Sequence, residues 1–343
     1  MCPIRSSIVV LGLVLTGCSQ PNLVFQTFPW EQADFYCIQG QPVYPTEKKD
    51  FCRSDRPLLF HDPKATFPVP ILFDESAGTG RGYDRLYVDF DGDGNFLNDP
   101  VYEAPKERPA LPEGFSGQVL AYFQNVHIVH NRQAQRFAHV QVLLYASGGA
   151  GGNALCMVVP QRWAVGTVRV GAKAVPAALI DRNWNDRFAD PAGLNLQEYP
   201  DRFPRGDYLL LAIDGEDRIA PSVTGGLGRD GTARGILTDY LVLDGGTYRV
   251  RAQQLAGGVK LELVPADLPG GKVDLAARAG QRVLLIGTKT CVLLRGAPKE
   301  ASVPADTYVA PLWESQMPFT VRPGQKAEAA RPGSPPGSDD GLF

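Results

Sequence analysis

The acidic segment DFDGDGNFLND, residues 89–99, contains the residues whose types and spacing point most directly to chemistry. Asp89, Asp91 and Asp93 alternate with other residues, and Asp99 follows six positions later. Carboxylates this close in sequence repel one another unless a cation neutralises them. Ca²⁺ takes about six to eight oxygen ligands from carboxylates, carbonyls and water. The spacing therefore predicts a structural calcium site.

The first half of this segment resembles the calcium loops of EF-hand and dockerin-like modules. In that pattern Gly94 falls at position 6, where the chain turns, and Asn95 falls at position 7, which supplies a backbone carbonyl. Position 12 is Pro100, which cannot be the closing acid, and the flanking residues predict strands. The resemblance therefore implies the ligand chemistry without the EF-hand fold, with Asp99 closing a shortened loop. A solvated Asp-Gly turn is the alternative.

A second segment, ALIDRNWNDRFADP at 178–191, repeats this frame with one residue fewer. Asp181, Asn183 and Asn185 keep oxygens at the first three ligand positions, and Asp190 precedes a proline as the last acid of the first loop does. An aspartate replaces the glycine at position 6, and two arginines lower the negative potential. We expect either weak metal binding here or a loop held by internal hydrogen bonds alone.

Other patterns give weaker indications of chemistry. His127 and His130 form H-x-x-H in a strand-like run, where residues three apart point to opposite faces, so we do not expect one ion to take both. Neither a G-x-S-x-G nucleophile motif nor a phosphate-binding glycine loop is present. Acidic neighbours such as Asp214 and Asp217 leave a glycosidase-like acid pair open, and we assign no catalytic residue.

The N-terminus has the features of an export signal. Arg5 precedes the apolar run 8–15, which is too short to span a bilayer as a helix. The following Leu-Thr-Gly-Cys, ending at Cys18, resembles a bacterial lipobox. That resemblance implies acylation of the Cys18 thiol and cleavage before it, with Ser19 favouring the outer membrane. We therefore expect a lipid anchor in the cell envelope.

The remaining cysteines fit an exported chain. Cys37 and Cys52 bracket a polar segment, which predicts a disulfide loop outside the cytoplasm, with two unpaired thiols as the alternative. Cys156 and Cys291 lie in apolar runs. Pairing between these two and burial as free thiols both remain open.

The elements that position these residues are predicted to be strands. Short apolar runs recur along the chain with glycine-rich turns between them, and no long amphipathic helical pattern is present. The pattern predicts an all-β fold of two or three sandwich-like or open-barrel modules, with the Asp-rich loops flanked by strands.

Composition shifts predict five segments. We expect a lipoprotein signal peptide at 1–17, a linker at 18–65 with the disulfide loop, a β domain at 66–200 with both Asp/Asn-rich loops, one or more C-terminal β-sandwich modules at 201–322, and a disordered tail at 323–343.

A turn followed by Thr-Tyr occurs twice in the C-terminal part, in LDGGTYRV at 243–250 and VPADTYVA at 303–310. The pattern resembles strand turns of Ig-like and prealbumin-like sandwich modules, and implies that architecture there.

Charge and composition set bounds on function. A net charge of -3 and 44% apolar residues are typical of a globular protein and give no sign of a nucleic-acid partner. We expect a non-catalytic surface or periplasmic binding protein, held on the membrane through Cys18, with an unknown protein or glycan ligand. The alternatives are a hydrolase of extracellular polymers and a scaffold subunit of an envelope assembly.

Overall fold

Every regular element of the described chain is a β-strand, which confirms the all-β prediction. The computed structural model describes residues 20–29, 37–38, 42–43, 51–54, 56–61, 69–78, 82–106, 117–131, 136–147, 154–181, 184–191, 193, 195–197, 206–212, 232–243, 245–276, 279–280, 283–294, 296–310 and 318–328. Within these ranges, no helix has the length and apolarity needed to cross a membrane.

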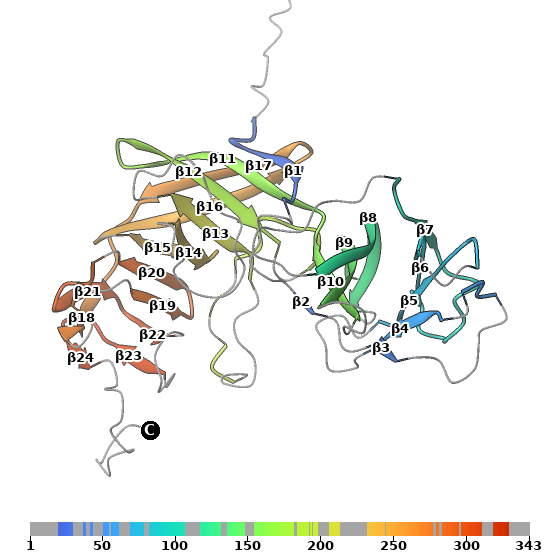
Figure 1. Cartoon of the computed structure of the whole chain (residues 1–343). Helices are drawn as coiled ribbons and strands as arrows, with labels where there is room; N and C mark the ends of the chain where they lie inside the picture. Colours follow the sequence, from blue (N-terminus) through green and yellow to red (C-terminus); the bar gives the residue numbers. More distant parts are fainter. Residues whose placement is uncertain are drawn as a thin grey trace, which may run out of the picture.

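A β-sandwich forms one end of the molecule, on the right in Figure 1. Its first sheet contains, in spatial order, β3 (Pro42–Val43), β4 (Leu58–Phe60), β5 (Ile71–Asp74), β6 (Arg85–Val88) and β7 (Val101–Glu103). Its second sheet contains β2 (Cys37–Ile38), β10 (Ala154–Pro160), β9 (Arg136–Ser147) and β8 (Gly117–Asn131). Alternate apolar residues from both sheets, such as Phe73 and Val142, share one core.

A large sheet forms the rest of the framework. Its order is β14 (Thr232–Ile236), β13 (Tyr208–Ala212), β12 (Lys173–Ile180), β11 (Arg162–Val170), β1 (Leu23–Thr27), β17 (Gly258–Pro265), β16 (Gly246–Leu255), β15 (Tyr240–Leu243), β20 (Thr290–Leu294), β19 (Val283–Gly287), β22 (Asp306–Val309) and β23 (Phe319–Val321). The sheet curls around its own core, so that Gly235 of β14 lies against Cys291 of β20. A Cβ at Gly235 would lie 2.7 Å from the Cys291 sulfur, so this approach needs glycine.

A small sheet packs against the far end of the large one. It contains β21 (Glu300–Pro304), β18 (Gly270–Asp274) and β24 (Lys326–Glu328). Its residues share a core with β15, β19, β20 and β22, which makes a second sandwich-like module at the C-terminal end.

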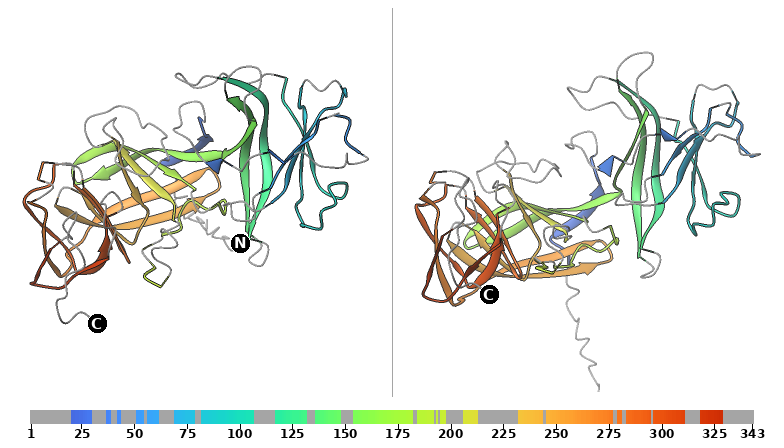
Figure 2. Two further views of the ribbon diagram at one scale, coloured as in Figure 1. Left: turned by 60° about the horizontal axis from the view of Figure 1, so that its bottom comes forward. Right: turned by 90° about the horizontal axis from the view of Figure 1, so that it is seen from below.

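The sandwich joins the large sheet through the outer face of β9 and β10, and Figure 2 shows the two parts side by side in both views. Leu143 and Tyr145 of β9 pack there against Ile180 of β12 and Leu210 of β13. Residues 140–145 of β9 are therefore buried on both faces of the strand, which explains why Gln141 is the only polar residue among them.

The segment 18–65, which we expected to be a linker, instead contributes strands to three sheets. Strand β1 pairs with β11 and β17, β2 pairs with β10, and β4 pairs with β5. Local composition conceals this because each strand is short and its partner is far away in sequence. In the expected C-terminal tail, 326–328 form β24, and the residues after 328 lie outside the described part.

Candidate metal centre

The first acidic loop begins where β6 ends, in the outer part of the sandwich. Asp89 follows the strand directly and is only 2% exposed. Its carboxylate and those of Asp91 and Asp93 each place an oxygen within 4.8 Å of the other two. Phe96 anchors the far side of the loop in a small core on the outer face of β5 and β6. The structure therefore brings together the first three predicted ligands.

Backbone amides hold one oxygen of each of these carboxylates. Asp89 Oδ2 accepts from Gly94 N at 3.2 Å, Asp91 Oδ1 from Asp93 N at 3.0 Å, and Asp93 Oδ1 from Asn95 N at 2.6 Å. Gly94 has a φ of 79°, which suits glycine. The amide of Asn95, followed by the side chain of Asn98, lowers the pKa of Asp93 and keeps its carboxylate charged. Each carboxylate therefore has a fixed orientation, and its second oxygen does not accept from these backbone amides.

Two buried carboxylate oxygens in this loop lack a hydrogen-bond partner among the described residues, and they are Asp89 Oδ1 and Asp99 Oδ2. The other oxygen of Asp99 accepts from Phe90 N at 3.0 Å. Burial raises the pKa of Asp99, and the charges of Asp91, Asp89 and Asp93 raise it further. Since a buried acceptor without a partner costs free energy, a cation at the three clustered carboxylates would offset that cost for Asp89. Asp99, the fourth predicted carboxylate ligand, does not belong to the group that lies within 4.8 Å of one another.

The described residues of the second loop repeat two backbone features of the first loop. Trp184 and Asp186, with φ of 57° and 60°, stand where Gly92 and Gly94 stand in the first loop. Asp181, only 5% exposed, accepts from Asp186 N at 2.6 Å through Oδ2, as the first aspartate of the other loop does from its glycine. The shared frame seen in the sequence is therefore also a shared three-dimensional turn.

Internal contacts replace free oxygens in this second loop. Asn185 Nδ2 donates to Asp190 Oδ2 at 2.6 Å. The carboxylate of Asp186 forms ion pairs with Arg162 Nη2 and with His139 Nδ1, each at 3.1 Å. Asn183 lies outside the described residues. Metal binding by Asp181, Asn183, Asn185 and Asp190 stays a prediction, whereas the hydrogen-bonded alternative has these contacts in its favour.

The second loop joins two hydrophobic cores, which its sequence pattern did not predict. Trp184 inserts into the sandwich core, while Phe188, four residues later, packs in the core of the large sheet. Phe188 N also donates to Gln254 Oε1 at 2.8 Å, and Arg162 lies over the Phe188 ring. An aromatic residue in a polar, Asp-rich loop is the signal that indicates such an anchor.

The histidines pair across strands and not along one strand. His127 of β8 lies opposite His139 of β9, and their rings stack at 4.9 Å with an interplanar angle of 4°. Burial, followed by the nearby His139, lowers the pKa of His127, and Asp186 opposes that shift. The side chain of His130 lies outside the described part. This pair was not predicted, because cross-strand register is not visible in sequence spacing.

The stability of the chain is expected to depend on pH through Asp181. Burial raises the pKa of this carboxyl to about 7, although backbone amides of the loop oppose the shift. The folded state therefore holds the proton more tightly than the unfolded chain, where aspartate titrates near a pKa of about 4. This contribution to stability is complete below about pH 4 and is lost as the pH rises through about 7.

The variant Asp181→Asn lacks that contribution. The stability advantage of the wild type over this variant should therefore shrink between about pH 4 and pH 7. Denaturant titrations in the presence of a calcium chelator, repeated at several pH values, measure the difference. A difference that stays constant with pH would contradict the assignment.

The cysteines lie in separate environments. Cys52 is buried in the small core with Leu72, Tyr87 and Phe96, and the side chain of Cys37 lies outside the described residues, as does Cys18. The Cys37–Cys52 disulfide stays a prediction. Cys156 belongs to the sandwich core and Cys291 to the core of the large sheet, so these two are not paired with each other.

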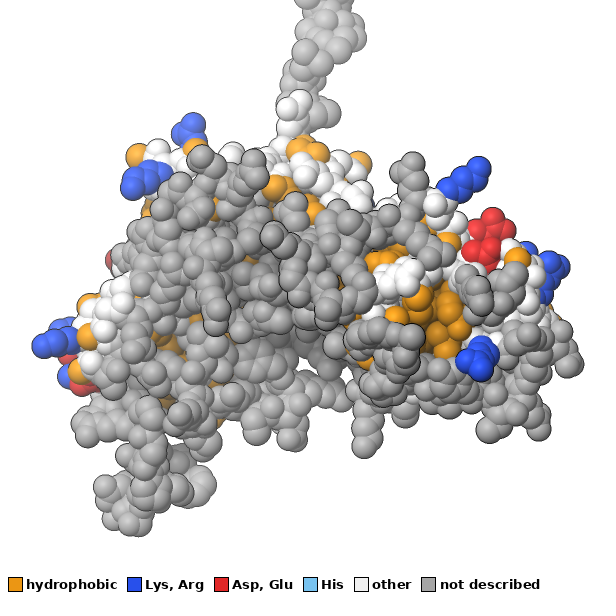
Figure 3. Space-filling view, in the orientation of Figure 1, with side chains coloured by type: hydrophobic (Ala, Val, Ile, Leu, Met, Phe, Trp, Pro, Cys, Tyr) orange, Lys and Arg blue, Asp and Glu red, His pale blue; other side chains and the backbone are white. Residues whose placement is uncertain are grey.

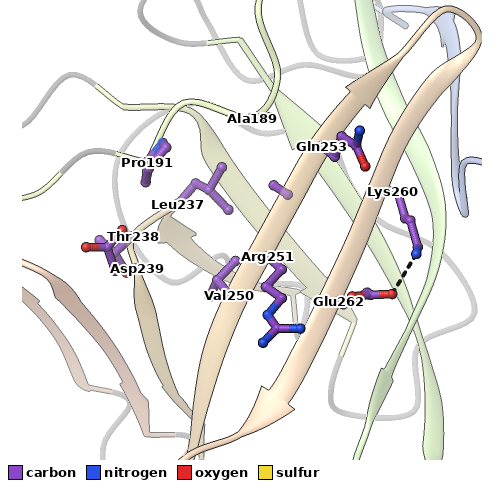
Figure 4. Close-up of a pocket in the computed structure, with 11 residues that line it drawn as sticks. Ala189, Pro191, Leu237, Thr238, Asp239, Val250, Arg251, Gln253, Lys260 and Glu262 are labelled. Atoms are coloured by element: carbon purple, nitrogen blue, oxygen red, sulfur yellow. Dashed lines mark ion pairs between the residues drawn. The ribbon is translucent and has the colours of Figure 1, made fainter.

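A pocket of about 350 Å³ lies beside β16 and β17 and is shown in Figure 4. Lys260 Nζ and Glu262 Oε1, 3.0 Å apart on its wall, form an ion pair. The buried hydroxyl of Thr238 donates to the Tyr240 carbonyl at 2.6 Å.

Comparisons of the chain with protein-family models, with curated proteins and with solved structures find no match.

Proposed function

We propose that this chain is an exported, lipid-anchored and non-catalytic binding protein of the cell envelope, and that the Asp89–Asp99 loop binds a structural Ca²⁺. The observation that carries the metal assignment is the buried Asp89 Oδ1. This oxygen has no hydrogen-bond partner among the described residues, and its carboxylate belongs to a group of three within ligand-sharing distance. Calcium would be held by Asp89, Asp91, Asp93, Asp99 and the Asn95 carbonyl, with water completing the shell.

The role proposed for the ion is to fix the turn between β6 and β7. Without a bidentate glutamate at the closing position, we expect the affinity of extracellular calcium modules, on the order of 10⁻⁴ to 10⁻³ M. Binding to the folded chain alone would add about 2.7 kcal/mol to its stability at about a hundred times the Kd. Mg²⁺ should add less because it prefers smaller, octahedral sites and releases water reluctantly.

Calcium titration calorimetry and thermal melts of the purified full chain test this assignment. The melting temperature should rise with millimolar Ca²⁺, and Asp91→Ala should abolish the rise because the cation loses a charged ligand. The matched control is Asp267→Ala, an exposed aspartate in the segment after β17, which should keep the full shift. Absence of both heat and melting shift in the wild type would return the loop to a solvated turn.

Lipid attachment is tested separately. Expression in a bacterial host with labelled palmitate should label the wild type, and Cys18→Ala should remove the label because the acceptor thiol is lost. Membrane fractionation of the same cells should place the wild type in the outer-membrane fraction. Equal labelling of the two proteins would contradict the anchor.

The alternatives concern the ligand and the chemistry. Asp214 and Asp217, the acids considered for a hydrolase, lie outside the described residues. The pocket beside β16 carries Asp239 and an ion-paired glutamate on its lining. A binding protein for a protein or glycan ligand remains the favoured proposal, with an envelope scaffold as the other non-catalytic role. On the face drawn in Figure 3, lysine and arginine side chains of the described part are scattered.

The Ig-like or prealbumin-like character of the C-terminal module also remains a proposal. Its support is local. Tyr308, the second residue of one Thr-Tyr pair, is fully buried, and its hydroxyl donates to the Pro304 carbonyl four residues earlier at 2.9 Å.

A further inference from the structure

The exposed side-chain amide of Asn98 contacts the clustered carboxylates of the acidic loop. Asn98 Nδ2 lies 3.3 Å from Asp91 Oδ2 and 3.0 Å from Asp93 Oδ2, so it donates to two of the three clustered carboxylates. These are the oxygens that the backbone leaves over, since the Oδ1 atoms of both aspartates accept from amides of the loop. A cation that approaches both leftover oxygens therefore meets the Asn98 amide.

The two ends of this amide have opposite effects on a cation. The nitrogen end donates to carboxylates and repels positive charge, whereas the oxygen end is a calcium ligand. Because the two ends have nearly the same size, a half turn about the Cβ–Cγ bond exchanges them without moving the backbone. Asn98 is exposed, so packed neighbours do not oppose that turn.

We propose that Asn98 is a further calcium ligand, which donates to Asp91 and Asp93 before the ion binds and presents its Oδ1 to the ion afterwards. This inference rests on the calcium site proposed above. The ligand set then gains a neutral oxygen near the end of the loop, where Pro100 cannot supply one. The buried Asp89 Oδ1, which has no hydrogen-bond partner among the described residues, independently indicates that the loop is built for a ligand.

The second loop supports this reading by contrast. Its residue before the last acid is Ala189, so it has no amide at the place of Asn98. Asn185 donates to Asp190 there instead, from a position that holds a carboxylate in the first loop. The first loop, which has four aspartates, thus keeps a side chain that can turn, whereas the second loop fixes its amide between its own residues.

The experiment is calcium titration calorimetry of the purified full chain with three substitutions. Asn98→Ala should weaken binding by about tenfold because a ligand is lost, and Asn98→Asp should strengthen it by about tenfold because a charged ligand replaces a neutral one. The matched control is Asn195→Ala, an exposed asparagine whose side chain accepts one backbone amide in another loop. It should bind calcium as the wild type does.

The affinities of the two Asn98 variants distinguish an amide that binds calcium from an amide that only blocks the site. If Asn98→Ala binds calcium as tightly as the wild type or more tightly, the amide only blocks the site, and the inference is overturned while the calcium site stands. Unchanged affinity in Asn98→Asp overturns it in the same way. If the wild type itself gives no heat, the calcium site is wrong.

Discussion

Replacement of Trp184 by alanine is expected to lower the free energy of unfolding by about 3–5 kcal/mol. The side chain is only 2% exposed and lies in the core of the sandwich, although its backbone belongs to the loop after β12. The loss combines the transfer of a large aromatic surface to water with the cavity that remains. Urea titration followed by circular dichroism measures it.

The conservative variant Trp184→Phe separates packing from loop conformation. Alanine and phenylalanine must both adopt the positive φ of 57° found at this position, but phenylalanine keeps most of the apolar area, so it should lose less than half as much stability as the alanine variant. Equal stability of Trp184→Ala and the wild type would show that the loop does not anchor the sandwich.

Replacement of Gln141 by leucine should destabilise the chain by about 2–5 kcal/mol. Gln141 is fully buried between the sandwich and the large sheet, and its Nε2 donates to the carbonyls of Phe28 and Pro160 at 2.9 and 3.0 Å. Its Oε1 accepts from the Tyr122 hydroxyl. Leucine of similar size would remove these three hydrogen bonds from a buried position. Denaturant titration measures the change.

The control is Gln124→Leu, the same chemical change at an exposed position whose amide also donates to the Tyr122 hydroxyl. It should change stability by less than about 1 kcal/mol. Similar losses in the two glutamine variants would mean that the buried position has no special role.

Local sequence patterns were sufficient for the fold class and for the frame of the acidic loops. Apolar alternation in β6 places Leu86 and Val88 on the sandwich core and Tyr87 on the opposite face, as a period of two predicts. The alternating aspartates come together because the turn at Gly94 folds the loop back on itself. Both features depend on residues near one another in the chain.

Features that depend on distant partners were not predictable in this way. Leu23 of β1 pairs with residues of β11 and β17, more than a hundred positions away. His127 meets His139 only because the register of β8 and β9 includes bulges. The sequence pattern places Trp184 in a loop, and its burial depends on the sandwich core that surrounds its side chain. Periodicity specifies which face is apolar, but not which surface covers that face.

The spacing of Trp184 and Phe188 has a consequence for how the molecule comes apart. These two anchors belong to different cores and are joined by a chain that extends at most about 14 Å. Neither core can open far without pulling an aromatic side chain out of the other. The sandwich and the curled sheet should therefore act as one cooperative unit in hydrogen exchange, with amide protection lost together on both sides of their junction.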